Sequence, residues 1–203
     1  ADGYRIKYFD DIKMLASTVS TTFGKFSAFG EASYRKGTPV SVNLTPGSTV
    51  GTVVRGDVIQ GNVGGIFNIG RTSFADDVSL AAEVSGARVM SVDQGDVNAM
   101  NNKTRNSLVA GATLTLGYPG IFEGWDLTVP ISYSQQLSGR TLLGGVGGKG
   151  DKRYSIGASF VHRGNLSVGV TYLGYAGGAS LDATSNRLLA DRDQLSLNMK
   201  YSF

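Results

Sequence analysis

Few side chains in this chain of 203 residues could support acid–base or metal chemistry. It contains no Cys and one His, His162. These counts exclude a disulfide framework, a thiolate metal site and a Cys nucleophile, and they make most Ser-His triads hard to build. His162 also stands beside Arg163 and Gly164, a sequence typical of a tight turn. We therefore predict no catalytic residues, no cofactor and no metal site, and we expect the protein not to be an enzyme.

Two short motifs are weak indicators of function. Arg55-Gly56-Asp57 is the adhesion tripeptide, which also occurs by chance. The glycine-rich stretch 144–150 resembles a phosphate-binding loop but lacks the Lys-Ser/Thr ending and a following helix. We expect the stretch to be a flexible surface loop.

The remaining candidates are charged residues that share a parity with small polar neighbours. They are Arg5, Lys7, Glu31, Arg35, Glu83, Asp126, Arg153 and Lys200. In a membrane barrel they would line the lumen, because a charge facing lipid at mid-membrane costs roughly 2–4 kcal/mol. Two interpretations stay open: a ring of charges that tunes solute selectivity, or a salt-bridge network that plugs or rigidifies the lumen.

These residues lie in segments that alternate between apolar and polar side chains. In the last segment, Leu195, Leu197 and Met199 alternate with Ser196 and Asn198. A period of two places the two kinds of residue on opposite faces of a strand. The pattern predicts about ten strands and no helix, at about 4–8, 12–24, 26–35, 57–71, 78–85, 108–118, 125–134, 153–160, 166–172 and 194–203.

Two residues interrupt this pattern. Pro130 falls within a strand, where it removes a ladder hydrogen bond, and it predicts a bulge or weakened pairing. Arg88 stands on the apolar parity, so we expect it above the membrane or beyond a bulge at Gly86.

The connections between strands alternate in length. Short turns alternate with long polar segments at about 37–56, 92–106, 135–151 and 177–190. This alternation predicts an antiparallel up-and-down meander with turns at one end and long loops at the other.

A soluble β-sandwich and a transmembrane barrel both produce such a pattern. Three features favour the barrel: polar parities rich in Ser, Thr, Gly, Asn and Gln, strands of about 10–13 residues, and aromatic residues near strand ends on the apolar parity. These aromatic residues are Tyr118, Trp125, Tyr133, Phe160, Tyr172, Tyr201 and Phe203. We predict that residues 1–203 are one antiparallel up-and-down transmembrane β-barrel domain, or the C-terminal portion of one.

Several phrases together resemble the domain-of-unknown-function family 1302 (DUF1302) of Proteobacteria. They are Tyr8-Phe9-Asp10-Asp11-Ile12, Gly30-Glu31-Ala32-Ser33-Tyr34-Arg35 with Pro39-Val40, Trp125-Asp126-Leu127-Thr128-Val129-Pro130, and the closing stretch from Arg192-Asp193 to Phe203. The resemblance implies the C-terminal part of a larger outer-membrane barrel that accompanies lipid- or hydrophobe-exporting envelope systems. It brings no catalytic motif.

The closing Tyr201-Ser202-Phe203 resembles the last strand of bacterial outer-membrane proteins, whose terminal aromatic residue is an assembly signal. This implies a Gram-negative outer membrane, a periplasmic C-terminus and extracellular long loops. The expected partners are outer-membrane lipid and lipopolysaccharide, the barrel-assembly machinery, and either periplasmic proteins or the remaining strands of a larger barrel. No basic stripe indicates nucleic acid.

We expect a porin-like transport function: a conduit, or the membrane component of an export system for a hydrophobic or lipid-like molecule. The alternative is a plugged barrel that only anchors partner proteins. A surface lipid hydrolase is a third hypothesis, disfavoured by the position of His162 in a turn.

Overall fold

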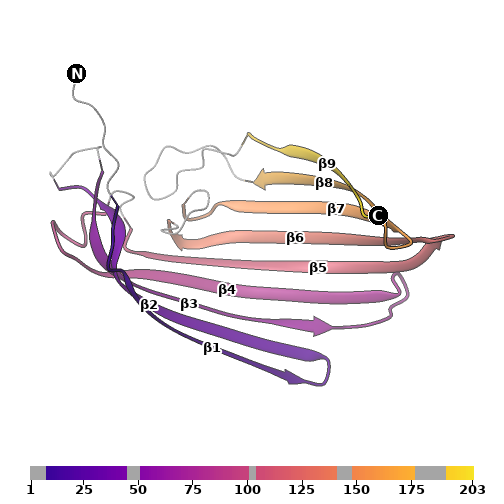
Figure 1. Cartoon of the computed structure of the whole chain (residues 1–203), viewed down its shortest axis with the longest axis horizontal. Coiled ribbons are helices and arrows are strands. Elements are labelled where there is room, and N and C mark those ends of the chain that lie inside the picture. Colours follow the sequence, from indigo (N-terminus) through magenta and orange to yellow (C-terminus); the bar gives the residue numbers. More distant parts are fainter. Residues whose placement is uncertain (1–7, 45–50, 101–103, 141–147, 177–190) are drawn as a thin grey trace.

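The protein forms a single antiparallel β-sheet in which the strands follow one another in chain order (Figure 1). The computed structural model describes residues 8–44, 51–100, 104–140, 148–176 and 191–203. Within these residues there are nine strands and no helix, and accordingly no helical segment long and apolar enough to cross a membrane. The strands are β1 (Lys13–Phe23), β2 (Phe26–Val42), β3 (Thr52–Asn68), β4 (Asp77–Val92), β5 (Asn106–Phe122), β6 (Trp125–Gly139), β7 (Lys152–His162), β8 (Leu166–Ala176) and β9 (Gln194–Tyr201).

The turns and the longer connections lie at opposite ends of the sheet. Residues 24–25, 69–76, 123–124 and 163–165 make the turns, which gather at the right of Figure 1. The up-and-down meander is therefore confirmed. Two connections are shorter than predicted, because β2 continues to Val42, β3 begins at Thr52 and β6 continues to Gly139. The loop expected at 177–190 and the strand expected at 4–8 lie wholly or mostly outside the described residues.

The described strands form an open sheet rather than a closed barrel. β1 and β9 are its two edges, and each pairs on one side with a described strand. The register nevertheless continues across all nine strands. One row of directly opposed residues runs from edge to edge through Phe23, Phe26, Phe67, Leu80, Leu114, Ile131, Ile156, Tyr172 and Leu195.

The neighbouring row points to the other side of the sheet. It runs through Thr22, Ser27, Ile66, Ala81, Thr113, Ser132, Ser155, Leu173 and Gln194. Because successive side chains alternate between faces, these two rows define an apolar face and a polar face. The alternation predicted from the sequence thus corresponds to two continuous surfaces.

The apolar face is exposed. Leu15 on β1 is 75% exposed, and Leu197 and Met199 on β9 are 79% and 76% exposed. Away from the edges, β4 shows the same arrangement, since Leu80 and Val84 are exposed while Glu83 and Ser85 on the polar face are half-buried. This is the reverse of a water-soluble sheet, in which the apolar side chains would be covered.

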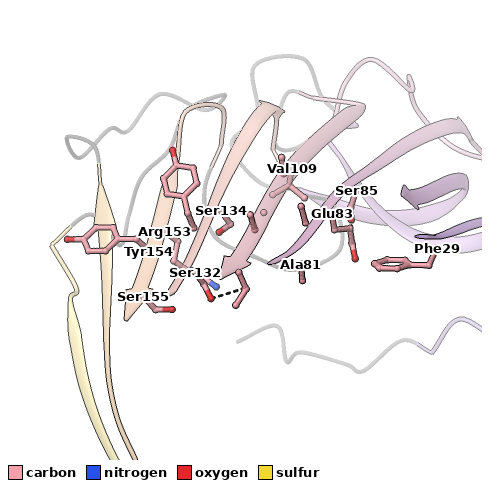
Figure 2. Close-up of a pocket in the computed structure, with 16 residues that line it drawn as sticks. Phe29, Ala81, Glu83, Ser85, Val109, Ser132, Ser134, Arg153, Tyr154 and Ser155 are labelled. Carbon is pink, nitrogen blue, oxygen red and sulfur yellow. Dashed lines mark hydrogen bonds between the residues drawn. The ribbon is translucent and has the colours of Figure 1, made fainter. Parts of the chain in front are cut away.

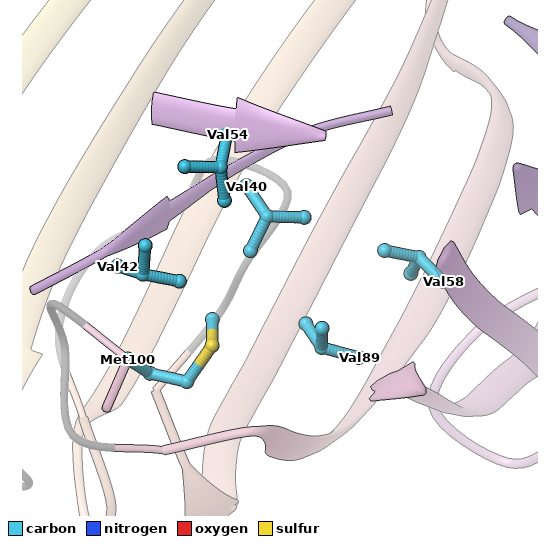
Figure 3. Close-up of a cluster of buried hydrophobic side chains, with 6 residues drawn as sticks. All are labelled: Val40, Val42, Val54, Val58, Val89 and Met100. Atoms are coloured by element: carbon cyan, nitrogen blue, oxygen red, sulfur yellow. The ribbon is translucent and has the colours of Figure 1, made fainter. Parts of the chain in front are cut away.

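A small cluster of buried apolar residues lies at the loop end of β2, β3 and β4. It consists of Val40, Val42, Val54, Val58, Val89 and Met100, here called the valine cluster (Figure 3). Val58 lies opposite Arg35 and Val89, which places this part of the cluster on the polar face. The connection after β4 contributes Met100, which bridges to Val42, and the amide of Asn43 donates to the carbonyl of Ala99 at 2.7 Å.

The weakened pairing predicted at Pro130 is confirmed. Pairing between β6 and β7 stops after Thr128 and resumes at Ile131 in the same register. The ring of Pro130 lies over Gly157, where an added Cβ would come within 3.3 Å of Pro130 Cγ.

Of the two explanations considered for the parity of Arg88, the bulge at Gly86 is wrong. Pairing of β4 with β5 runs without interruption through Gly86 to Arg88, and the register shift lies instead between Asp57 and Val58 of β3. Arg88 is exposed and lies opposite Ile59, so its parity is that of the apolar face near the loop end.

Candidate functional site

The polar face is hollowed where β4, β5, β6 and β7 lie side by side. The hollow has a volume of about 380 Å³, and its polar-face lining is mostly small (Figure 2). The lining includes Ala81, Gly111, Thr113, Ser132 and Ser134, with Glu83 and Arg153 as its charged residues. Thr113 Oγ1 and Ser132 Oγ share a hydrogen bond of 2.9 Å. The strands therefore combine a floor of small side chains with two opposite charges.

Glu83 and Arg153 belong to one register row. The row runs from Glu83 through Gly111 and Ser134 to Arg153. Three strand intervals separate the two charges, or about 14 Å between their backbones. Ser85 Oγ donates a hydrogen bond to the Glu83 carboxylate, and the Arg153 guanidinium lies 5.5 Å from the centre of the Tyr175 ring. The two charges thus stand apart across the hollow and create an electric field along it.

The other predicted charges within the described residues also lie on the polar face. Glu31 and Arg35 occupy β2 four residues apart, Asp126 lies opposite Val161, and Lys200 lies opposite Ser167. Arg5 and Lys7 lie outside the described residues. Asp126 Oδ1 accepts the Gly120 amide at 2.8 Å, so this carboxylate holds the end of β5 against β6.

A salt-bridge network is absent from the described part of the polar face. The ion pairs of the described residues join Arg55 to Asp10 and Arg71 to Asp76, at 2.7 and 3.2 Å. Both pairs lie away from the hollow, toward the strand ends. Glu31, Arg35, Glu83 and Arg153 therefore form no ion pair with another described side chain.

Two tyrosine–aspartate contacts were missed by the sequence analysis. The Tyr34 hydroxyl donates to Asp57 Oδ2 at 2.8 Å, and the Gly37 amide donates to Asp57 Oδ1 at 3.1 Å. The Tyr172 hydroxyl donates to Asp193 Oδ2 at 2.5 Å, and the Tyr175 amide donates to Asp193 Oδ1 at 3.0 Å. In both, one carboxylate binds a tyrosine hydroxyl and the amide three residues later.

The same contacts account for the tripeptide Arg55-Gly56-Asp57. It lies within β3, with Asp57 held by Tyr34 and Arg55 by Asp10. The Arg55 guanidinium also lies 5.7 Å from the centre of the Phe9 ring. Arg55 therefore anchors the segment before β1, and both charged residues of the tripeptide have intramolecular partners.

Replacing Tyr172 by Phe is expected to lower stability at pH 7 and to have little effect at pH 2. The Tyr172 hydroxyl, followed by the Tyr175 amide, lowers the pKa of Asp193. A lowered folded-state pKa stabilises the fold above the unfolded value of about 3.9, and this contribution is lost as pH falls through the folded value. Thermal unfolding of both proteins at pH 7 and pH 2 measures the difference.

Tyr133→Phe is the matched control, because the Tyr133 hydroxyl donates to the uncharged side chain of Gln135 at 3.0 Å. Its effect should not change between the two pH values. A Tyr172→Phe effect of equal size at both pH values would contradict the role of the Asp193 charge.

The single histidine lies at the end of β7 rather than inside the turn. His162 lies opposite Trp125, and the two ring centres are 4.8 Å apart. At the chain's end, Tyr201 lies opposite Leu166, and its ring centre is 5.8 Å from that of Phe203. No group of three potential metal ligands occurs in the part of the chain that the structure describes.

A family model described as "Protein of unknown function (DUF1302)" matches residues 1–203. No curated protein and no solved structure matches the chain.

Proposed function

Because the chain belongs to the DUF1302 family of proteins of unknown function, we propose a function from its geometry. The nine strands are part of the wall of a transmembrane β-barrel in the outer membrane of a Gram-negative bacterium. The polar face lines a conduit for solutes, and the apolar face contacts lipid. The short turns and the C-terminus are periplasmic, and the long loops are extracellular.

The observation that carries this proposal is the exposed apolar face. The row from Phe23 to Leu195 is apolar on all nine strands, and the residues on the opposite face are mostly small or polar. The apolar row starts next to a turn on β1 and ends near the loop side of β9. Strands staggered in this way are required for a tilted, closed barrel.

The edges of the sheet must be paired in lipid, because no water is present to satisfy their backbone groups. In a meander of nine strands, β1 and β9 run in the same direction. Fully antiparallel closure therefore needs an odd number of further strands. The strand expected at 4–8 would supply one, and the further strands of a larger barrel would supply more.

The hollow and its unpaired charges favour a conduit. Its lining of Ser, Thr and Gly with Glu83 and Arg153 fits polar solutes. A hydrophobic or lipid-like cargo and a place in an export system remain predictions from the resemblance alone. The partners would be outer-membrane lipid, lipopolysaccharide and the barrel-assembly machinery. The assembly machinery would recognise Tyr201 and Phe203.

A second candidate, the plugged anchoring barrel, is favoured by the valine cluster. These buried side chains lie at the loop end and partly on the polar face, where they narrow the mouth of a lumen. Single-channel recording in a planar bilayer separates the two functions. Conductance steps support the conduit, whereas a folded but silent barrel supports the anchor.

The membrane location itself is tested by the fluorescence of Trp125, the chain's one tryptophan. Trp125 begins β6 beside a turn, and Tyr133 on the same face lies eight residues away, or about 26 Å along the strand. At a strand tilt of about 40°, this length spans about 20 Å of membrane depth, which is most of the roughly 25 Å height of the lipid-facing band of outer-membrane barrels. We expect brominated phospholipids to quench Trp125 most strongly when the bromine lies near the headgroup. Equal fluorescence with and without brominated lipid would contradict the proposal.

A further inference from the structure

The turn between β7 and β8 has an unfavourable residue at its tip. Arg163 and Gly164 both have positive φ, 47° and 76°, and the Asn165 amide donates to the His162 carbonyl at 3.0 Å. A β-turn with positive φ at both of its central residues favours Asn followed by Gly at those two positions. Arginine in the left-handed region costs free energy that Asn largely avoids. The fold of the turn therefore does not account for an arginine at this position.

The position of Arg163 does bring its side chain to the neighbouring turn. The Arg163 amide donates to the Gly124 carbonyl at 3.0 Å. An atom in the place of a Cβ on Gly124 would lie 3.3 Å from Arg163 Nε and 3.3 Å from His162 Nε2. The two nitrogen atoms thus face the same narrow space beside Gly124, where any other residue would place its side chain.

This space lies at the edge of the apolar face. His162 stacks on Trp125, and the next directly opposed pair on the same face, Leu127 and Phe160, is apolar. An amphiphile can therefore place its headgroup at Gly124 and its chains along Leu127 and Phe160. The acidic neighbour is Glu123, which is exposed, and no described side chain forms an ion pair with Arg163.

We propose that Arg163 and His162 bind the phosphate of a membrane phospholipid on the periplasmic side of the barrel. The inference rests on the proposed membrane location. A guanidinium group recognises phosphate oxygens through paired hydrogen bonds, and Trp125 lies beside it with the ring position typical of a membrane interface. The ligand is a lipid headgroup rather than free phosphate, because the apolar face continues directly from the site.

The test is native mass spectrometry of the full chain in detergent, titrated with phosphatidylglycerol. Arg163→Asn should bind the lipid at least about tenfold more weakly, a factor that corresponds to about 1.4 kcal/mol. The same variant should fold with equal or greater stability, because Asn suits the turn. His162→Phe, which preserves an aromatic ring against Trp125, should weaken binding by a smaller factor.

Arg71→Asn is the matched control, since Arg71 is an exposed arginine in the turn between β3 and β4. It should bind the lipid like the original protein, and diacylglycerol, which lacks phosphate, should not bind. Unchanged lipid binding by Arg163→Asn would overturn the proposal, as would displacement of the lipid by equimolar inorganic phosphate. If brominated lipid quenches Trp125 and Arg163→Asn still binds phosphatidylglycerol as the original protein does, the proposed lipid site is wrong but the proposed membrane location stands. If brominated lipid does not quench Trp125, both the proposed membrane location and the proposed lipid site are contradicted.

Discussion

Replacing Leu114 by Arg is expected to destabilise the protein in a lipid bilayer by about 2–4 kcal/mol and to reduce its assembly in the membrane sharply. Leu114 lies at the centre of β5, directly opposite Leu80 and Ile131 on the apolar face. Neither neighbour can neutralise the new charge, and the strand holds the arginine at mid-membrane. Urea unfolding in lipid vesicles measures the change in the free energy of unfolding.

Two further variants of β5 give this prediction its controls. Phe122→Arg places the same charge at the turn end of the strand, where Phe122 lies opposite Trp125 and is 63% exposed. A charge near the membrane interface costs only about 0–1 kcal/mol. Thr115→Arg places it on the polar face, opposite Ser79 and Pro130, where water solvates it. We expect both variants to assemble.

The changes in the free energy of unfolding of the three variants together show whether lipid or protein covers the apolar face. In lipid, the cost depends on depth and falls from Leu114 to Phe122. If a second protein layer covered the face, arginine would be costly wherever the layer makes contact, with no relation to membrane depth. Equal destabilisation by Leu114→Arg and Phe122→Arg would therefore contradict the barrel.

The two faces of the sheet could be predicted from the sequence because side chains alternate with a period of two. A slip of one residue would move every apolar residue of a strand to the other face, so the alternation excludes registers shifted by an odd number of residues. Ile131, for instance, is opposed by Leu114 and Ile156, as the alternation of all three segments requires. The up-and-down meander was predictable from a second pattern, the alternation of short and long connections between the strands.

The ends of the strands were less predictable. Lys36, Gly37 and Pro39 suggest a loop, yet β2 continues through a register shift to Val42. The reason is tertiary: Val40 and Val42 pack against β3 and against Met100 from a distant connection. A single segment carries no signal for such a contact.

The candidate site was predicted only in part. Its charges were identified from their parity, but the opposition of Glu83 and Arg153 depends on the register of four strands. The aspartate partners of Tyr34 and Tyr172 were missed because each carboxylate comes from a segment distant in the sequence, Asp57 from within β3 and Asp193 from the residue before β9. The spacing of a tyrosine hydroxyl and a backbone amide three residues later is present in the sequence, but it does not indicate which aspartate binds them.

Neutralising the two charges of the hollow one at a time is expected to shift ion selectivity in opposite directions. Glu83→Gln should make the conduit more selective for anions, and Arg153→Gln should make it more selective for cations. Each charge lies about 7 Å from the midpoint of the hollow, so in water it contributes about 0.6 kcal/mol to the energy of an ion there. The same charge shifts the energies of a cation and an anion by this amount in opposite directions, so the permeability ratio should change roughly sevenfold.

The measurement is the reversal potential across a planar bilayer with a salt gradient. The double variant should return near the original ratio, because the two contributions are opposite and similar in size. Arg71→Gln, in an exposed turn, is the control and should leave the ratio unchanged. The shifts should also shrink in 1 M salt, where the screening length falls to about 3 Å, well below the distance from charge to ion. Shifts in the same direction for both variants would mean that the charges act through the fold rather than through the field across the hollow, and the polar face would then not be the wall of the conduit.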